Sequence, residues 1–577
     1  MPSLLRLLRQ YIWLLVGAVL GALFTLSRRG LLQQQHQQQA PRPVRRRIRA
    51  TEQHTSMAKW PDGLAVHWHA SNAQLAELDT VIRDAKGRAQ QQDEAVDWAQ
   101  RQRQVVGAAR DAWHAYAQDA FGRDEYMPLS HTGRNFTHLG VGYIMADMLD
   151  TLWLMGLRSE YAQARDFLAN QVTFDQRGAI SLFETTIRLL GGLLSAFHLS
   201  GETDYKLLAL ADDLGTRLAR SFNTTTGIPP ETAILRSDGM PFATECSTSE
   251  SSTLQLEFRY LAKLTGKREY QQQVDRIMDV MLAAPKYDSL VPTRIDSRTG
   301  LFTGADISLG SRGDSYYEYL LKQWLQTEQT EVDLRAEYDA AMRGVKRYLV
   351  ATSPSQHLTF VGELISADDA PRFSPKMDHL VCFLAGNLAL GATNGSALAD
   401  VPHLSARDRD DLVLARELAE TCARMYFDTE SGLAPEIAYF RHVDPQTGNE
   451  LGYSAHDQLV PPDGDILVPT NDRHCLLRPE TVESFYILWR ITGENKWRAY
   501  GWRVFEAIEK WAKLDDKGYS SLHDITQVPP SRRDSVESFF VAETLKYLFL
   551  LFADDDPLPL TKYVFSTEAH PFPRFDW

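Results

Sequence analysis

Acidic residues recur at the starts of apolar helical segments in this chain. Glu184 in LFETTIRLL, Glu250 in SESSTLQLEFRYL and Asp314 in GDSYYEYLLKQW follow one another at intervals of 66 and 64 residues, and His379 in MDHLVCFLAG continues the series after 65 more. The same pattern returns later in the chain, at Glu436, Glu480, Glu483, Glu537 and Glu543. Side chains at equivalent positions of a repeat meet at one place if the repeats close into a ring.

Pooled carboxylates raise one another's pKa, so such a pocket needs compensation. A hard divalent cation such as Ca²⁺, which takes about 6 to 8 oxygen ligands, is one solution. Glycoside hydrolysis, which uses one protonated and one ionised carboxyl group, is the other. Glu184 and Arg188 stand four residues apart, as a solvated surface pair or as partners within the pocket. Aromatic residues suited to sugar rings lie beside the acids, although each alone is equally typical of a core: Phe183, Tyr316, Tyr317, Phe485, Phe539 and Phe540.

An interval near 65 residues fits two helices and their loops, so the roughly 480 residues from 95 to 577 hold about seven helical hairpins. Such hairpins either stack as an open solenoid or close into a ring of paired helices. Closure is favoured because KYLFLLF, FYILWRI and MADMLDTLWLMGL are apolar on nearly all sides, as helices of an inner ring should be. The sequence therefore predicts an all-α domain.

Composition excludes some functions. The formal charge of −14 argues against nucleic acid as a partner, since phosphate binding needs clustered basic residues. The four cysteines are too few for a disulfide scaffold and lack C-x-x-C spacing. Each is read as an isolated buried thiol, or, in a lumenal compartment, as part of one or two structural disulfides.

The N-terminal region predicts a membrane anchor. Residues 11–27 carry no charge and are flanked by arginines; at about 1.5 Å per residue they span roughly 25 Å, enough for a thin membrane. A cleaved signal peptide is the alternative. Residues 1–10 then form a short cytosolic tail and residues 28–94, which are Gln-rich and basic, a flexible stem and lead-in. The basic flank favours a cytosolic body, whereas the sequons at Asn135, Asn223 and Asn394 favour a lumenal one.

Seven sequence blocks resemble the signature blocks of class I α-1,2-mannosidases, glycoside hydrolase family 47. They are SLFETTIRLLGGLLSAFHLSG, LQLEFRYLAKLTG, GSRGDSYYEYLLKQW, MDHLVCFLAGNLALG, LRPETVESFYILWRITG, ESFFVAETLKYLFLLF and YVFSTEAHP, in family order between about Arg103 and His570. The resemblance implies an (α/α)7 barrel over residues 95–577. It also implies calcium-dependent hydrolysis, with inversion, of α-1,2-linked mannose on high-mannose N-glycans.

The resemblance also implies roles for individual residues. Glu184 would be the acid, acting through a water, and Glu480 the base, with Asp314 the competing candidate for the acid. Thr567 would bind Ca²⁺ directly through its hydroxyl and carbonyl oxygens. Four carboxylates would hold the waters of the ion: Glu436, Glu483, Glu543 and Glu568. The residues that would line the sugar pocket are Arg188, His379, Arg478 and Phe539, with Glu250 slightly further out.

Cys382 and Cys422 match the disulfide pair of the family, whereas Cys246 and Cys475 fall outside that pattern. Arg312, two residues before Asp314, resembles the endoplasmic reticulum type, which removes one mannose from the nine-mannose glycan to give isomer B. The resemblance further implies type II topology, a lumenal and monomeric body, and residence in the endoplasmic reticulum membrane or the early Golgi.

Three alternatives stay open. The first is broader trimming of the Golgi type. The second is a glycan-binding degradation factor of the same fold with weak activity. The third is a helical scaffold in which Glu480 has no chemical role.

Overall fold

The computed structural model describes residues 65, 67–87, 96–236, 245–367, 370–443, 458–460, 464–516 and 518–577. All of them belong to one compact unit, Ser56–Trp577. No helix in these ranges combines the length and the hydropathy that a membrane crossing requires. The predicted cytosolic tail, the anchor at 11–27 and most of the predicted stem lie outside the described residues.

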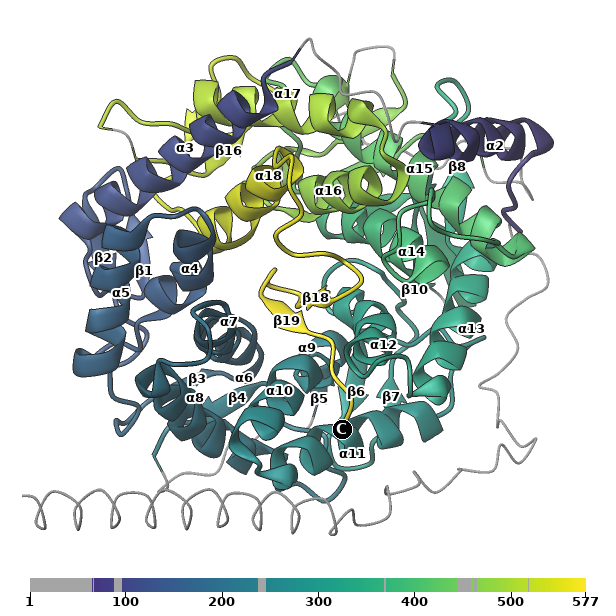
Figure 1. The fold of residues 1–577 in the computed structure, drawn as a ribbon. Coiled ribbons are helices and arrows are strands. Elements are labelled where there is room, and N and C mark those ends of the chain that lie inside the picture. The colour runs from purple at the N-terminus through teal and green to yellow at the C-terminus, as the bar shows by residue number, and fades with distance from the viewer. Residues whose placement is uncertain are drawn as a thin grey trace, which may run out of the picture. The chain divides into compact units, whose positions relative to one another are not determined.

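Within the described residues, seven helices form an inner ring in which each helix contacts the next (Figure 1). They are α4 (Tyr143–Leu154), α7 (Gly191–Leu199), α10 (Gln255–Thr265), α12 (Asp314–Gln326), α14 (Phe383–Thr393), α16 (Glu480–Thr492) and α18 (Lys546–Leu551). Each packs against an outer helix: α5 (Arg158–Gln171), α8 (Tyr205–Leu218), α11 (Arg268–Ala283), α13 (Val332–Tyr348), α15 (Ala406–Phe427), α17 (Asn495–Trp511) and, for α18, α3 (Trp98–Asp119). The last inner helix, α18, is joined to the first, α4, through η6 (Phe540–Leu545), the π-helix that precedes α18 and contacts α4. The predicted ring of paired helices is therefore present in the described domain.

Burial explains the division into two layers. Every residue of α14 is buried, and so is every residue of α12 from Ser315 to Gln326. The outer helix α11, by contrast, buries one stripe at Tyr270, Val274, Ile277, Met278 and Met281. Sequences that are apolar all round thus belong to the inner ring, and amphipathic ones to the outer ring.

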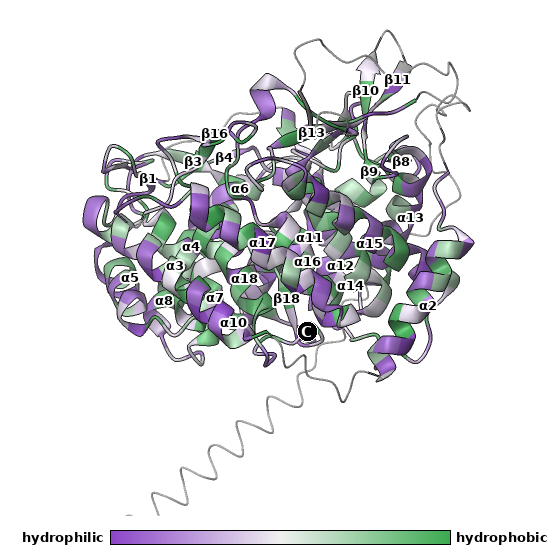
Figure 2. Ribbon diagram, turned by 90° about the horizontal axis from the view of Figure 1, so that it is seen from above, coloured by the Kyte–Doolittle hydropathy of each residue, from purple (hydrophilic) through white to green (hydrophobic). Residues whose placement is uncertain are grey.

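Short strands and helices connect the pairs, and the small sheets other than β18–β19 gather at one end of the barrel (Figure 2). The short helices are α6 (Leu182–Glu184), η2 (Thr185–Leu190), η3 (Ala219–Phe222), α9 (Thr248–Ser252), η4 (His379–Cys382), η5 (Thr470–Asp472) and η6 (Phe540–Leu545). The two-stranded sheets pair β1 (Glu125–Met127) with β2 (Thr132–Arg134), β3 (Ala179–Ser181) with β4 (Thr232–Ile234), β8 (Val350–Thr352) with β9 (Thr359–Val361), β10 (Glu363–Ala367) with β11 (Ala370–Ser374), β16 (Leu522–Asp524) with β17 (Ser531–Arg532) and β18 (Tyr563–Phe565) with β19 (Pro571–Pro573).

Two larger sheets complete this end. One has three strands, β5 (Glu245–Ser247), β6 (Arg294–Asp296) and β7 (Phe302–Thr303). The other has four antiparallel strands in the order β12 (Lys376–Asp378), β13 (Ile437–Phe440), β15 (Ile466–Val468) and β14 (Gln458–Val460).

The C-terminal hairpin β18–β19 lies inside the ring, against α12 and α7 (Figure 1). Its turn, residues 566–570, therefore reaches the interior of the barrel from the last segment of the chain.

One part of the predicted stem differs from expectation. Helix α2 (Asn72–Gly87) packs against α15 and α16, with Leu78 and Val81 buried. Arg416 of α15 donates to Glu77 at 2.8 Å. Two apolar residues three positions apart give this otherwise polar helix a narrow contact stripe, which is too weak a signal to stand out beside the Gln-rich stretch that precedes it.

Candidate active site

Two of the predicted acids occupy equivalent capped positions. Ser181 Oγ accepts a hydrogen bond from the backbone N–H of Glu184 at 3.1 Å, and Ser247 Oγ accepts one from Glu250 at 3.3 Å. In each case a serine at the end of a strand caps a short helix and places a glutamate in its first turn. The repeated S-x-x-E sequence thus fixes these acids at the end of the barrel that carries the sheets.

The apolar segments after Glu184 and around Glu543 are not regular α-helices. Residues Thr185–Leu190 and Phe540–Leu545 form π-helices, η2 and η6, which continue into α7 and α18. Such turns are rare and occur frequently at functional sites. They carry Arg188 and Glu543, so both π-helices lie at predicted site residues.

Arg188 pairs with Glu184 as its spacing predicts, and it also binds residues distant in sequence. Its Nε donates to Glu184 Oε2 at 2.8 Å, and its Nη1 donates to Glu568 and, at 3.3 Å, to Ser538 Oγ. Only 9 % of Arg188 is exposed. The pair is therefore part of a buried network and not a solvated surface contact.

Phe539 lies between two guanidinium groups. Its ring centroid is 5.4 Å from Arg188 Cζ and 5.3 Å from Arg478 Cζ. Arg478 Nε donates to Glu436 Oε1 at 2.6 Å. Antiparallel pairing of β12 with β13 positions Glu436 beside His379, whose N–H donates to the Glu436 carbonyl at 2.9 Å.

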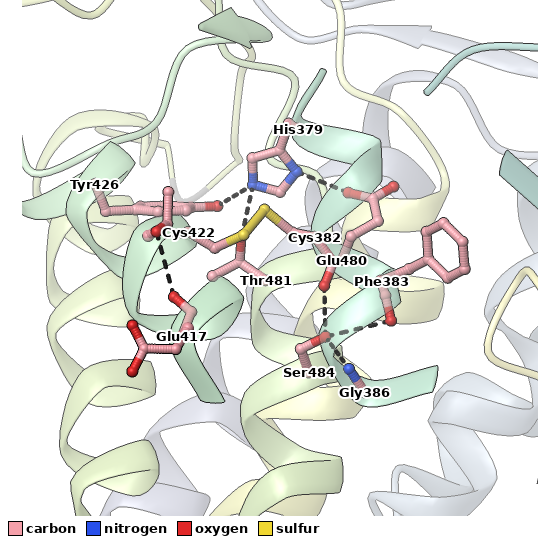
Figure 3. The surroundings of a disulfide bond; sticks show 11 residues. His379, Cys382, Phe383, Gly386, Glu417, Cys422, Tyr426, Glu480, Thr481 and Ser484 are labelled. Atoms are coloured by element: carbon pink, nitrogen blue, oxygen red, sulfur yellow. Dashed lines mark hydrogen bonds and ion pairs between the residues drawn. A yellow bond between two sulfur atoms is a disulfide. The ribbon is translucent and has the colours of Figure 1, made fainter. Parts of the chain in front are cut away.

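Glu480 opens α16 and is held by His379 (Figure 3). His379 Nδ1 lies 2.8 Å from Glu480 Oε2, and Nε2 lies 2.8 Å from Tyr426 Oη and 3.2 Å from Thr481 Oγ1. Because a carboxylate only accepts, Nδ1 donates to Glu480, while Nε2 faces the hydroxyl groups of Tyr426 and Thr481. Burial opposes ionisation of Glu480, but the hydrogen bond and charge of His379 and the charge of Arg478 lower its pKa below the ordinary value.

The pKa of Asp314, at the start of α12, is shifted in the opposite direction from that of Glu480. Burial raises the pKa of Asp314 to about 7, against the hydrogen bonds that it accepts from the Ser315 N–H and from Ser249. The Ser315 N–H lies 2.8 Å from Asp314 Oδ1. Below about pH 7 the site thus combines a carboxyl group, Asp314, that is largely protonated with one, Glu480, that is ionised. The third candidate, Glu184, has a side chain that is 39 % exposed, against 12 % for Glu480.

Thr567 lies in the turn between β18 and β19, inside the ring. Its hydroxyl donates to Glu318 Oε2 at 2.9 Å. Lys322 binds the other oxygen of Glu318 and lies 3.5 Å from Glu483 Oε1. Tyr547 Oη donates to the same Glu483 oxygen at 3.3 Å.

Three buried carboxylates stand close enough to disturb one another's ionisation. Burial raises the pKa of Glu483 to about 7. Burial also holds the pKa of Glu543 and Glu568 well above the ordinary value, with further increases from Glu480 at Glu543 and from Glu543 at Glu568. Within the part of the chain that the structure describes, no hydrogen bond or ion pair reaches the Glu543 side chain. This corner of the site therefore concentrates carboxyl groups whose ionisation the protein alone disfavours.

Glu250 and Arg312 are less buried than the carboxyl groups around Thr567: Glu250 is half-buried and Arg312 is exposed. Burial and the neighbouring Glu231 and Glu184 raise the pKa of Glu250 to about 7, while the charge of Arg312 lowers it. Arg312 is exposed, with a left-handed backbone at φ 74°, and its carbonyl accepts from the Ser249 N–H at 3.0 Å.

A cavity of about 140 Å³ opens beside Glu184 and Arg188. The other residues that line it are Asp124, Glu125, Phe136, Tyr143, Ile144, Val536, Glu537 and Ser538. Tyr143 Oη donates to Glu184 Oε2 at 3.3 Å, so the cavity gives access to the carboxyl group that Arg188 holds.

Hydrogen bonds, ring contacts and electrostatic coupling thus join all the predicted site residues. Sequence reasoning did not identify Glu318, Lys322, Tyr426 and Tyr143. A signal existed for Glu318, which stands four residues after Asp314 and four before Lys322 and so repeats the Glu184–Arg188 spacing. No sequence spacing indicated Tyr143 or Tyr426. Their partners, Glu184 and His379, are distant in sequence and only the fold brings them together.

The Cys382–Cys422 disulfide is present, with an S–S distance of 2.08 Å. It joins η4 to α15, close to His379 and Tyr426 (Figure 3). Cys246 and Cys475 are free and buried.

A barrel of paired helices whose network contains one carboxyl group with a raised pKa and one with a lowered pKa is the kind of arrangement that glycoside hydrolysis can use. Comparison with known sequences agrees. The chain belongs to glycosyl hydrolase family 47, whose sequence model matches residues 108–574.

Individual relatives extend the match. A mannosyl-oligosaccharide 1,2-alpha-mannosidase of Arabidopsis thaliana is 45 % identical over 500 residues, which cover 82 % of this chain and 79 % of the relative. The endoplasmic reticulum mannosyl-oligosaccharide 1,2-alpha-mannosidase of Homo sapiens is 42 % identical over 481 residues, covering 82 % of this chain and 64 % of the human protein. The solved structure of an alpha-1,2-mannosidase from Trichoderma reesei superposes with a TM-score of 0.73 at 29 % identity, covering 83 % of this chain and 99 % of that one.

Proposed function

We propose that this protein hydrolyses terminal α-1,2-linked mannose residues of high-mannose N-glycans, with inversion. The names of the similar proteins support the substrate class. The observation that carries the chemistry is the separation of two carboxyl groups within one network: burial keeps the pKa of Asp314 near 7, whereas His379 and Arg478 keep Glu480 ionised. Environments that push two carboxyl pKa values apart define an acid and a base.

Glu480 is the proposed base. In the part of the chain that the structure describes, His379 is hydrogen-bonded to Oε2 of Glu480, and Oε1 is the oxygen proposed to take a proton from the attacking water. The acid is Asp314 or Glu184. Asp314 has the pKa that a proton donor needs near neutrality, and Glu184 has a side chain that is 39 % exposed and lines the cavity.

The residues around Thr567 fit a calcium ion. Glu543 is a buried carboxylate without a protein partner in the described residues, and Glu483 and Glu568 lie within its electrostatic reach. No group of three His, Cys, Asp or Glu side chains in the described ranges is arranged to bind a metal directly. The oxygens of Thr567 and of the carboxyl groups near it suit an ion held by the hydroxyl and carbonyl oxygens of Thr567 and, through waters, by Glu436, Glu483, Glu543 and Glu568. Bound there, Ca²⁺ would act as a Lewis acid and as a template for sugar hydroxyls.

We also propose that trimming stops after one mannose, converting the nine-mannose glycan to the eight-mannose isomer B. Arg312 supports this assignment, because its exposed guanidinium stands at the outer edge of the site, where it can bind several sugar hydroxyls of one branch. The proposed location is the endoplasmic reticulum membrane, with residues 11–27 as a type II anchor and a lumenal, monomeric body. The names of the similar human, rat and fission yeast proteins support the compartment.

The test is a time course of mannose release from a nine-mannose glycan, with Ca²⁺ or with a chelator. Glu480→Gln is expected to lower kcat by about 10² to 10⁴ with little change in KM, since it removes the base and leaves the pocket. Glu420→Gln, on the outer helix α15 where Glu420 binds Lys496, is the matched control and should keep wild-type kcat. A wild-type protein that binds the glycan but releases no mannose in Ca²⁺ would instead be a glycan-binding relative.

A further inference from the structure

A fully buried polar cluster lies behind the turn between β18 and β19. Asp150, on α4, accepts hydrogen bonds from His570 Nδ1 at 2.8 Å and from Ser195 Oγ at 2.8 Å. Lys546 Nζ lies 3.0 Å from Asp150 Oδ1. None of these four side chains has solvent exposure. One carboxylate therefore ties together α4, α7, α18 and the C-terminal hairpin.

The same cluster fixes the backbone of the turn. Ala569 has a φ of 56°, a left-handed conformation that non-glycine residues rarely adopt. Lys546 Nζ donates to the Ala569 carbonyl at 2.8 Å, so a side chain from outside the hairpin holds this residue. Within the turn, the Ala569 N–H donates to the Ser566 carbonyl at 3.1 Å and the Ser566 N–H to the His570 carbonyl at 2.9 Å. Thr567 lies between these fixed points.

Two adjacent glycines allow the close packing of α7 against His570 and α4. A Cβ at Gly191 would lie 2.7 Å from His570 Cδ2, and one at Gly192 would lie 2.0 Å from the Ala146 carbonyl oxygen. The Gly-Gly pair thus lets α7 approach both α4 and the imidazole closely, which brings Ser195 and His570 to the same carboxylate.

We propose that Asp150, Lys546 and His570 are positioning residues that hold Thr567 and Glu568 in the conformation that binds calcium. This inference rests on the proposed calcium-dependent function. The ion would need two oxygens of one residue, the Thr567 hydroxyl and carbonyl, and their relative orientation is set by the backbone of the turn. Partners outside the first coordination shell commonly change metal affinity 10- to 100-fold when they are removed.

The test compares two buried lysines. Lys546→Met removes the donor to the Ala569 carbonyl. Lys346→Met is the matched control, because Lys346 is also buried and binds two carboxylates, Asp410 and Asp411 of α15, but contacts no part of the hairpin in the described residues. The readouts are the Kd for Ca²⁺ by titration calorimetry on the folded, chelator-stripped full chain, and the Tm with and without Ca²⁺.

We expect Lys546→Met to raise the Kd 10- to 100-fold and Lys346→Met to leave it within twofold, although both lower the Tm of the metal-free protein. If Lys546→Met does not fold, the double variant Asp150→Asn/Lys546→Met, which leaves no unpaired buried charge, should fold and show the same loss of affinity. An unchanged Kd for Ca²⁺ in the folded Lys546→Met variant or in the double variant overturns the positioning role of the cluster, but it does not contradict the proposed calcium site. A wild-type protein that does not bind Ca²⁺ overturns both.

Discussion

Replacing Ser249 by alanine tests which carboxyl group is the acid. Ser249 donates a hydrogen bond that favours the ionised form of Asp314, whose pKa burial raises to about 7. A hydrogen bond to a charged group contributes about 1.5 kcal/mol or more, and 1.36 kcal/mol corresponds to one pKa unit. Ser249→Ala should therefore raise the pKa of Asp314 by about 1. Since an acid works only while protonated, the alkaline limb of the kcat/KM profile should move to higher pH by the same amount.

The assay is kcat/KM for mannose release between about pH 5 and pH 9 in Ca²⁺, for the wild type, Ser249→Ala and Ser251→Ala. Ser251 is equally buried on the same short helix and serves as the matched control. The wild type and Ser251→Ala should share an alkaline midpoint near 7. The reasoning is wrong if the midpoint of Ser249→Ala coincides with theirs, and the acid role then passes to Glu184.

Three further predictions concern stability and specificity. Because burial raises the folded-state pKa of Asp314 and Glu483 to about 7, above their unfolded values near 4, the folded protein binds more protons in this range. The Tm in chelator should therefore fall by several degrees as the pH rises from about 4.5 to about 7, and added Ca²⁺ should raise it more at pH 7.5 than at pH 5; a flat profile would contradict this. Removing the Cys382–Cys422 bond, which closes a loop of 40 residues, should lower the free energy of unfolding by up to about 4 kcal/mol in the chain-entropy treatment, and a denaturant midpoint unchanged in the double serine variant would refute it. Arg312→Leu should convert a single eight-mannose product into a ladder, as mass analysis of the released glycans would show, and a product series identical to that of the wild type would remove Arg312 from branch selection.

The ring of helices could be predicted from the sequence because its signal is local and repeated. The segment KYLFLLF is apolar on nearly all sides, and its first six residues form α18 of the inner ring, where all but Phe549 are buried. The interval between acidic helix starts gave the number of hairpins, since each pair of helices needs a similar length of chain. The disulfide followed from the resemblance to the family and not from geometry.

Other features could not be predicted because distant partners create them. The π-helix η2 carries Arg188, whose partner Glu568 lies 380 residues further along the chain. The left-handed backbone of Ala569 is held by a lysine from another element, and alanine has no local preference for that conformation. The spacing of Glu318 to Lys322 could have identified this glutamate from the sequence. Its other partner could not be predicted, because the Thr567 hydroxyl that donates to Glu318 belongs to a hairpin 249 residues further along the chain.

The C-terminal hairpin explains why these long-range contacts coincide at one place. Glu568 meets Arg188 from η2, Thr567 meets Glu318 from α12, and His570 meets Asp150 from α4. A turn of five residues inside the ring thus bonds to three separate repeats, so its conformation is fixed only when the ring is closed. The acid and base candidates Glu184 and Glu480 lie on elements that the same closure brings together. The contacts of the site are therefore complete only in the closed ring, and a defect in the packing of the last hairpin should disturb the site before it disturbs the outer layer of helices.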